Sequence, residues 1–235
     1  MRRVRELVTA VNQAYPHDPF FDRFAESCRA NPAKTKAYRT YDDAFRLLDS
    51  GSWNLLKAKA VAHFRDHRSG QLKQGFFNQL NEAFAYRHLL RQGFTAVRML
   101  PETGKRIPDL QYRAGRVRQH CEVKTLNISD EEISRRGSGK AFSNVYLRLG
   151  EGFFKKLAAS IASARSQIDS QGTGGLVYVV AVWDDIALDC YRGYRRQLAS
   201  FARANAIDGV HIKVGLRFNR RMRLTSACSR RRPAR

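Results

Sequence analysis

Two short segments of the chain carry side chains that could act on a phosphate. They are residues 107–112 (IPDLQY) and residues 121–124 (CEVK). Asp109 and Glu122 offer carboxylate oxygens, which are the ligands that hard divalent cations take, and Lys124 offers an ammonium that can stabilise negative charge. Together these groups could hold a divalent cation beside a phosphate.

The two segments are predicted to be neighbouring strands of a β-hairpin. Apolar and polar residues alternate in both, as in strands with one buried face, and residues 113–116 (RAGR) supply the turn. Pairing centred between Ala114 and Gly115 sets Asp109 opposite His120 and one diagonal step from Glu122. One face then carries Asp109, Gln111, Arg113, Arg116, Arg118, His120, Glu122 and Lys124. We expect the opposite, mostly apolar face to join the core.

The elements around the hairpin predict an α/β fold. From residue 74 onward the pattern predicts α-β-β-β-α-β-α-β, which suits a mixed sheet with helices on both faces. The predicted elements are helix 74–91 ended by Gly93, strand 94–100, hairpin 107–126, helix 153–168, buried strand 176–183, helix 194–204 and strand 210–218. Residues 127–150 are polar and without pattern, and we interpret them as a mobile loop.

Three regions are expected along the chain. Residues 1–70 read as a helical N-terminal extension, because apolar residues recur there at helical spacings with no strand signal. Residues 71–216 form the α/β domain. Residues 217–235 hold eight arginines and no acid, which predicts a basic, disordered tail.

This arrangement resembles the PD-(D/E)xK nuclease superfamily. The resemblance lies in Pro108-Asp109 and Glu122-Val123-Lys124 on adjacent strands, with a helix before them and a helix and strand after them. It implies a restriction-endonuclease-like αβββαβ core over about residues 74–183.

The resemblance also implies roles for individual residues. Asp109, Glu122 and the Val123 carbonyl would hold Mg²⁺, with Mn²⁺ able to substitute, and Lys124 would sit beside the attacking water. Glu82, on the preceding helix, would be a further catalytic metal ligand. Gln167, on the helix that follows the hairpin, would lie near the metal and the nucleic acid.

The charge of the chain indicates a polyanionic partner. Lys and Arg number 43 against 21 Asp and Glu, a net charge of +22, which favours nucleic acid. DNA is favoured over RNA as the partner. No aromatic-rich RNA-binding signature is present to decide between the two, so that choice stays open. The expected nucleic-acid contacts are Arg113, Arg116, Arg118, His120, Arg135, Arg136, Lys140, Lys155, Lys156 and Gln167. Many members of the family dimerise so that each subunit cuts one strand, so the resemblance leaves a homodimer open.

Other features exclude some classes of protein. The four cysteines are far apart and form no CxxC pair, which argues against a structural zinc site and for a reducing compartment. His63 and His67 could share a metal at their spacing of four, but no third ligand accompanies them. The longest apolar run is too short to span a bilayer. We expect a cytoplasmic protein, associated with the nucleoid if it is bacterial.

The sequence therefore favours a metal-dependent, endonucleolytic DNA nuclease. Two alternatives stay open. The chain could be a catalytically inactive nucleic-acid-binding module of the same fold, or an interaction protein for an acidic partner that uses the tail as a tether.

Overall fold

The computed structural model describes residues 1–67, 72–103, 106–127, 148–182, 190–214 and 220–224. Its helices are α1 (Arg2–Ala14), α2 (Phe24–Ala30), α3 (Pro32–Phe45), α4 (Ser50–Ala62), α5 (Gln74–Arg91), α7 (Glu151–Asp169) and α9 (Tyr191–Ala204), with a 3₁₀ turn, η1 (Pro19–Phe21). Its strands are β1 (Thr95–Met99), β2 (Leu110–Ala114), β3 (Val117–Leu126), β4 (Gly175–Ala181), β5 (Val210–Val214) and β6 (Arg220–Leu224).

The strands form one mixed sheet in the order β1-β2-β3-β4-β5-β6. The pairs β1–β2, β2–β3 and β5–β6 are antiparallel, whereas β3–β4 and β4–β5 are parallel. A parallel connection needs a crossover, and α7 supplies it between β3 and β4, as α9 does between β4 and β5. The predicted element order is confirmed, with one further strand at its end.

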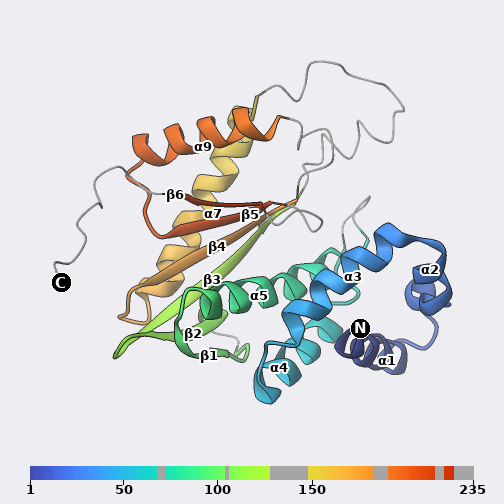
Figure 1. Ribbon diagram of the computed structural model, residues 1–235. Coiled ribbons are helices and arrows are strands. Elements are labelled where there is room, and N and C mark those ends of the chain that lie inside the picture. Colours follow the sequence, from blue (N-terminus) through green and yellow to red (C-terminus); the bar gives the residue numbers. More distant parts are fainter. Residues whose placement is uncertain (68–71, 104–105, 128–147, 183–189, 215–219, 225–235) are drawn as a thin grey trace.

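Helices cover both faces of the sheet (Figure 1). Helix α5 lies on one face, with the other N-terminal helices beyond it, and α7 and α9 lie on the opposite face. The alternation along β4 explains both cores, because Tyr178 and Val180 join the α5 side while Val177 and Val179 join the α7 side. Among the described helices, none combines the length and the apolar composition that crossing a bilayer requires.

The N-terminal helices share a core with the sheet and are not an appendage to it. Buried residues from α1 to α5 form one continuous cluster with residues of β1 to β4. Hydrogen bonds cross the same boundary: Tyr41 donates to Asn81 (3.2 Å), and Asn81 donates to Thr125 (3.0 Å). This chain of bonds joins α3 through α5 to β3.

The predicted register of the hairpin is wrong by two residues. Gln111, not Asp109, pairs with His120, and Ala114 pairs with Val117. The two-residue turn is Gly115-Arg116. Gly115 takes φ +61°, a left-handed backbone conformation that glycine adopts without a steric penalty. A shift of two residues leaves every side chain on its predicted face.

The prediction of disorder from residue 217 is also wrong in part. Residues 220–224 form β6 and pair with β5, and Leu224 is buried in the core on the α7 side. Backbone pairing and this apolar anchor outweigh the arginine-rich composition. Residues 225–235 lie outside the described residues, as do 128–147 of the predicted mobile loop and 215–218 of the predicted last strand.

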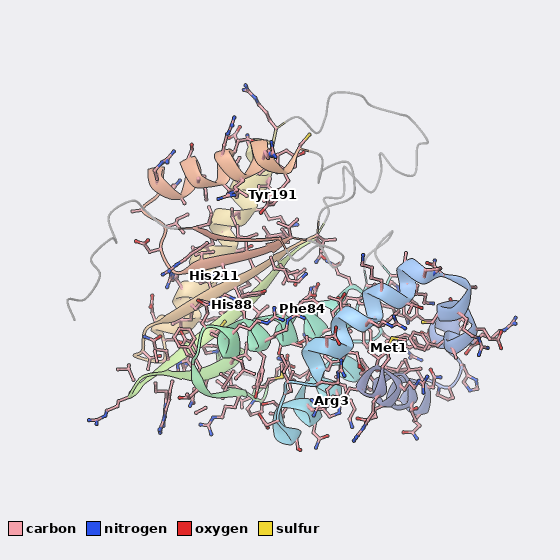
Figure 2. The ribbon with its side chains drawn as sticks, viewed as in Figure 1. Met1, Arg3, Phe84, His88, Tyr191 and His211 are labelled. Atoms are coloured by element: carbon pink, nitrogen blue, oxygen red, sulfur yellow. The ribbon has the colours of Figure 1, made fainter. Side chains whose placement is uncertain are left out.

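Polar side chains also lie between α5 and β5. The rings of His88 and His211 pack in a tilted arrangement with centroids 4.2 Å apart, and the Lys213 ammonium lies 4.3 Å from the centre of the Phe84 ring. Figure 2 shows His88, Phe84 and His211 in this layer. This group belongs to β5 and α5 and lies apart from the hairpin residues that the sequence singles out.

Gly175→Ala should lower the free energy of unfolding, because a Cβ at Gly175 would overlap the carbonyl oxygen of His120 on β3. We expect a loss of about 1–3 kcal/mol, the usual cost of overpacking, measured by urea unfolding. Gly174→Ala is the matched control, since its Cβ would lie 3.7 Å from the Gln119 side chain, an ordinary contact. Equal losses in the two variants would contradict the close approach of β3 and β4.

Candidate active site

Asp109 and Glu122 meet where β2 begins beside β3. The backbone N–H of Asp109 donates to Glu122 Oε2 (3.2 Å), and the backbone N–H of Val123 donates to Asp109 Oδ2 (2.8 Å). The first bond holds the Asp109 backbone against β3, and the second holds its side chain there. The register shift thus brings the two predicted carboxylates closer than the sequence-based pairing did.

Lys124 and Gln167 complete this side of the site. The Lys124 ammonium donates to Glu122 Oε1 (2.6 Å) and to Gln167 Oε1 (2.8 Å). Gln167 projects from α7 and its amide nitrogen also reaches the carbonyl of Ile107 (3.4 Å). Helix α7 therefore fixes the position of Lys124 through Gln167. As expected from the sequence, this glutamine lies close to the hairpin carboxylates.

Glu82 enters the site from α5, paired with a lysine from α4. The Lys59 ammonium lies 2.6 Å from Glu82 Oε1, 3.5 Å from Asp109 Oδ1 and 3.6 Å from Glu102 Oε1. Lys59 and Glu82 are both buried, with 7% and 4% of their surface exposed. Glu82 is therefore a buried site residue and not a solvated helix residue.

Lys59 is the site residue that sequence reasoning missed. It lies on the buried stripe of α4, which also contains Trp53, Leu56 and Ala60. The available signal was its spacing of three from the core residue Leu56, which places both residues on the same helix face. A lysine on a buried face is expected to have a partner, because lysine is almost never fully buried without one. Its partner is 23 residues away in sequence, so spacing alone could not identify it.

Burial and mutual repulsion dominate the electrostatics of the carboxylates. Burial raises the pKa of Glu122 to about 8, the charge of Asp109 adds to the rise, and Lys124 opposes it. Burial and Asp109 likewise raise the pKa of Glu82 well above its ordinary value, against the effect of Lys59. Burial alone would lower the pKa of Lys59, but Glu82 and Asp109 outweigh it and the pKa is raised. The three carboxylates Glu82, Asp109 and Glu122 thus outnumber the two ammonium groups of Lys59 and Lys124.

Alternating charges lead from Lys59 toward the surface. Glu102 lies between Lys59 and His63, whose Nε2 is 3.4 Å from Glu102 Oε2. His63 Nδ1 is 2.5 Å from Asp66 Oδ2, and hydrogen bonds to these two acids raise the pKa of His63 despite its burial. His67 instead contacts the carbonyl of Arg65 (2.7 Å), so the two histidines do not share a site.

The carboxylates have the chemistry that a hard divalent cation requires. Glu82 Oε2 is buried and has no hydrogen-bond partner in the described part of the chain, so it is an acceptor with spare capacity. Glu82, Asp109 and Glu122 are the donor type that Mg²⁺ and Mn²⁺ prefer. Within the described ranges, however, no three His, Cys, Asp or Glu side chains are grouped closely enough to form a ready metal cluster. The Lys59 ammonium lies between Glu82 and Asp109.

The predicted nucleic-acid contacts lie in several places. Arg113, Arg116 and Arg118 are exposed at the turn end of the hairpin. His120 is buried and its Nδ1 is 2.6 Å from Thr173 Oγ1, so it packs inside the protein and its pKa is lowered by burial and by Arg118.

The remaining predicted contacts lie on α7 or beyond the described residues. The Lys155 ammonium pairs with Glu151 (2.8 Å), and that of Lys156 donates to the carbonyl of Asn127 (3.3 Å). Arg135, Arg136 and Lys140 are outside the described ranges.

Comparison of the chain with protein-family models, with curated proteins and with solved structures found no match. The arguments for function therefore come from the residues themselves.

Lys59→Met should destabilise the protein by about 3 kcal/mol in the absence of divalent ions, because it leaves Glu82 as an unpaired buried carboxylate. The measurement is urea unfolding in EDTA. Lys57→Met, two residues away on α4, is the matched control and should change stability by less than about 1 kcal/mol, since Lys57 is only half-buried. A similar small effect of both changes would show that Lys59 does not balance the buried acids.

Glu122→Gln should change how stability depends on pH. The folded pKa of about 8 exceeds the unfolded value of about 4.3, so the folded protein holds this proton more tightly and becomes less stable as pH rises between the two values. In EDTA, the wild type should therefore lose thermal stability relative to Glu122→Gln from about pH 5 to pH 8. Mn²⁺ should restore the wild type more at the higher pH, because ligands bind metal deprotonated.

The control for this experiment is Glu151→Gln, which alters an exposed carboxylate at the start of α7. Its thermal stability should follow that of the wild type across the same range. A constant difference between wild type and Glu122→Gln at every pH would refute the raised pKa.

Proposed function

We propose that this chain is a divalent-metal-dependent nuclease that hydrolyses phosphodiester bonds in DNA and acts endonucleolytically. One observation carries the proposal: the Asp109 backbone N–H donates to Glu122 beside the Lys124 ammonium, and the Lys59 ammonium links Asp109 to Glu82 of α5. Buried carboxylates beside a held lysine are expensive to maintain, and functional sites are where such groups with shifted pKa values gather.

The chain's own residues divide the work between them. Glu82, Asp109, Glu122 and the carbonyl of Val123 would hold Mg²⁺ or Mn²⁺. When bound, the ion would supply Lewis acidity toward the phosphate and lower the pKa of its water. Lys124, oriented by Gln167, would stabilise negative charge that develops on the phosphate.

The element order supports membership of the PD-(D/E)xK superfamily. The sequence α5-β1-β2-β3-α7-β4 has the αβββαβ order of its restriction-endonuclease-like core, with Asp109 immediately before β2 and Glu122 and Lys124 in β3. The net charge of +22 supports a nucleic-acid substrate.

A nucleic-acid-binding module that does not cut is the second candidate. The Lys59 ammonium favours it, because a lysine that already offsets part of the charge of Glu82 and Asp109 reduces the demand for a metal ion. The two candidates differ in whether DNA is nicked when a divalent ion is supplied.

Asp109→Asn should reduce nicking of supercoiled plasmid in Mn²⁺ more than about 100-fold, beyond what loss of an outer partner of a metal costs. The asparagine keeps the hydrogen bond from Val123 but removes the charge. DNA binding in EDTA should stay within about twofold, because Asp109 carries no positive charge. Asp22→Asn, an exposed change, is the control and should cut normally.

Wild-type protein that binds plasmid but never nicks it in Mg²⁺ or Mn²⁺ would favour the binding module. Nicking that persists in Asp109→Asn would place the chemistry elsewhere in the chain.

A further inference from the structure

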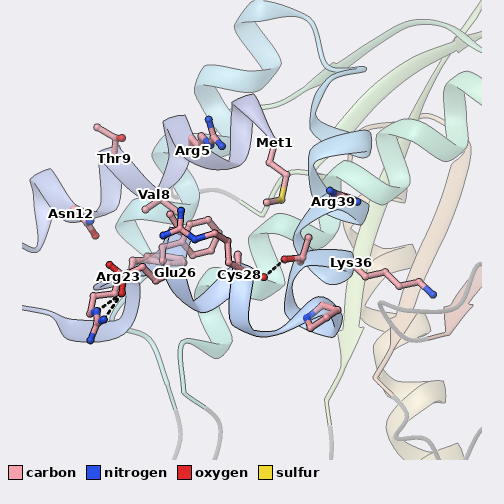
Figure 3. Close-up of a pocket in the computed structure, with 16 residues that line it drawn as sticks. Met1, Arg5, Val8, Thr9, Asn12, Arg23, Glu26, Cys28, Lys36 and Arg39 are labelled. Carbon is pink, nitrogen blue, oxygen red and sulfur yellow. Dashed lines mark hydrogen bonds and ion pairs between the residues drawn. The ribbon is translucent and has the colours of Figure 1, made fainter.

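A hollow separate from the candidate active site lies in the helical region between α1, α2 and α3 (Figure 3). It measures about 1070 Å³. Its wall on one side is the face of α1 that carries Arg5, Val8, Thr9 and Asn12, and α2 and α3 supply the other sides. None of the residues of the candidate active site lines it.

The rim of this groove carries positive charge that the described residues leave without an acidic partner. Arg5, Arg29, Lys36 and Arg39 are exposed, and in the described ranges no carboxylate pairs with them. Glu26 is the one acid in the described lining, and it is already paired with Arg23. The groove therefore has an excess of cationic groups contributed by three different helices.

The floor of the groove is apolar and fixed. Phe24 and Cys28 of α2 are buried beneath it, and Phe24 packs edge-on against Tyr38 of α3 with ring centroids 4.9 Å apart. The Thr35 hydroxyl donates to the carbonyl of Cys28 (2.5 Å), which ties α3 to α2 at the base. Cations above an apolar floor keep their strength for an anion, because the protein side of the groove excludes water.

We propose that this groove binds the sugar-phosphate backbone of a DNA strand at a distance from the catalytic residues. The inference rests on the proposed function, since it assigns the groove to the same substrate. Cations spread over three helices suit a row of phosphates better than a single anion. Nucleic-acid backbones present such a row, and most protein–DNA hydrogen bonds go to phosphate and sugar.

Rigid contacts connect the groove to the catalytic residues. Helix α1, which forms one wall, also packs against α4, the helix of Lys59. The Tyr15 hydroxyl just after α1 donates to the carbonyl of Val61, two residues beyond Lys59 (3.0 Å). DNA held in the groove would thus contact helices whose position relative to the active site is fixed by packing.

The test compares two double charge reversals that change net charge equally. Lys36→Glu/Arg39→Glu alters the groove, and Arg192→Glu/Arg195→Glu alters exposed positions with the same spacing on α9. Affinity for labelled single-stranded and duplex oligonucleotides is measured by fluorescence anisotropy in EDTA over a range of salt concentrations. Because no metal is present, the result does not depend on cleavage.

The groove variant should bind DNA at least 10-fold more weakly than the α9 variant at equal salt. Its plot of log affinity against log salt should be shallower than wild type by about 2, roughly one counterion for each lost phosphate contact. A neutral pair, Arg5→Gln/Arg29→Gln, should weaken binding in the same direction. This neutral variant keeps the test valid if the charge-reversed groove variant misfolds. Far-ultraviolet circular dichroism checks that both variants are folded.

Equal weakening by the groove and α9 reversals would overturn the proposal, because only net charge would then matter. Preferential loss of binding to poly-glutamate, with DNA affinity retained, would assign the groove to an acidic peptide instead and also overturn it. A chain that fails to nick plasmid but shows the groove-specific loss would refute the nuclease and leave the DNA groove standing.

Discussion

The arrangement of the site depends most on the buried contact between the Lys59 ammonium and the Glu82 carboxylate. Each charge loses most of its hydration, and such a loss is offset only when the partners are close and well oriented, as they are at 2.6 Å. The contact ties α4 to α5, and through Asp109 it ties both helices to β2. The helical N-terminal region therefore supplies part of the site, and its removal would leave buried acids without a counter-charge.

Strand pairing supplies the rest of the geometry. Asp109 is held by one hydrogen bond to Glu122 and one from Val123, so its position follows directly from the register of β2 on β3. Helix α7 then covers the polar face and orients Lys124 through Gln167. Residues that are unremarkable singly become a site because a hairpin, a crossover helix and a helix from the opposite face meet at one end of two strands.

Much of this arrangement could be predicted from the sequence, and the exceptions have physical reasons. The polar face of the hairpin was predicted from the period of two alone, which is why an error of two residues in register left it intact. Helix α5 and its end at Gly93, with φ +78°, follow from local signals. Lys59 could not be placed because its partners are distant in sequence. Strand β6 was not predicted, because its arginine-rich composition is typical of a disordered tail. Composition does not reveal that the edge of β5 offers backbone hydrogen-bond partners.

The charges of the site show why a divalent ion and a phosphate belong to the proposed function together. Glu82, Asp109 and Glu122 carry one more negative charge than Lys59 and Lys124 neutralise, and half-exposed Glu102 is screened by solvent. A proton can remove the excess, in line with the raised pKa values of Glu82 and of Glu122, which is about 8. A divalent ion alone would overshoot by one positive charge. The ion and one phosphodiester, with its single negative charge, together bring the buried site to neutrality without that proton.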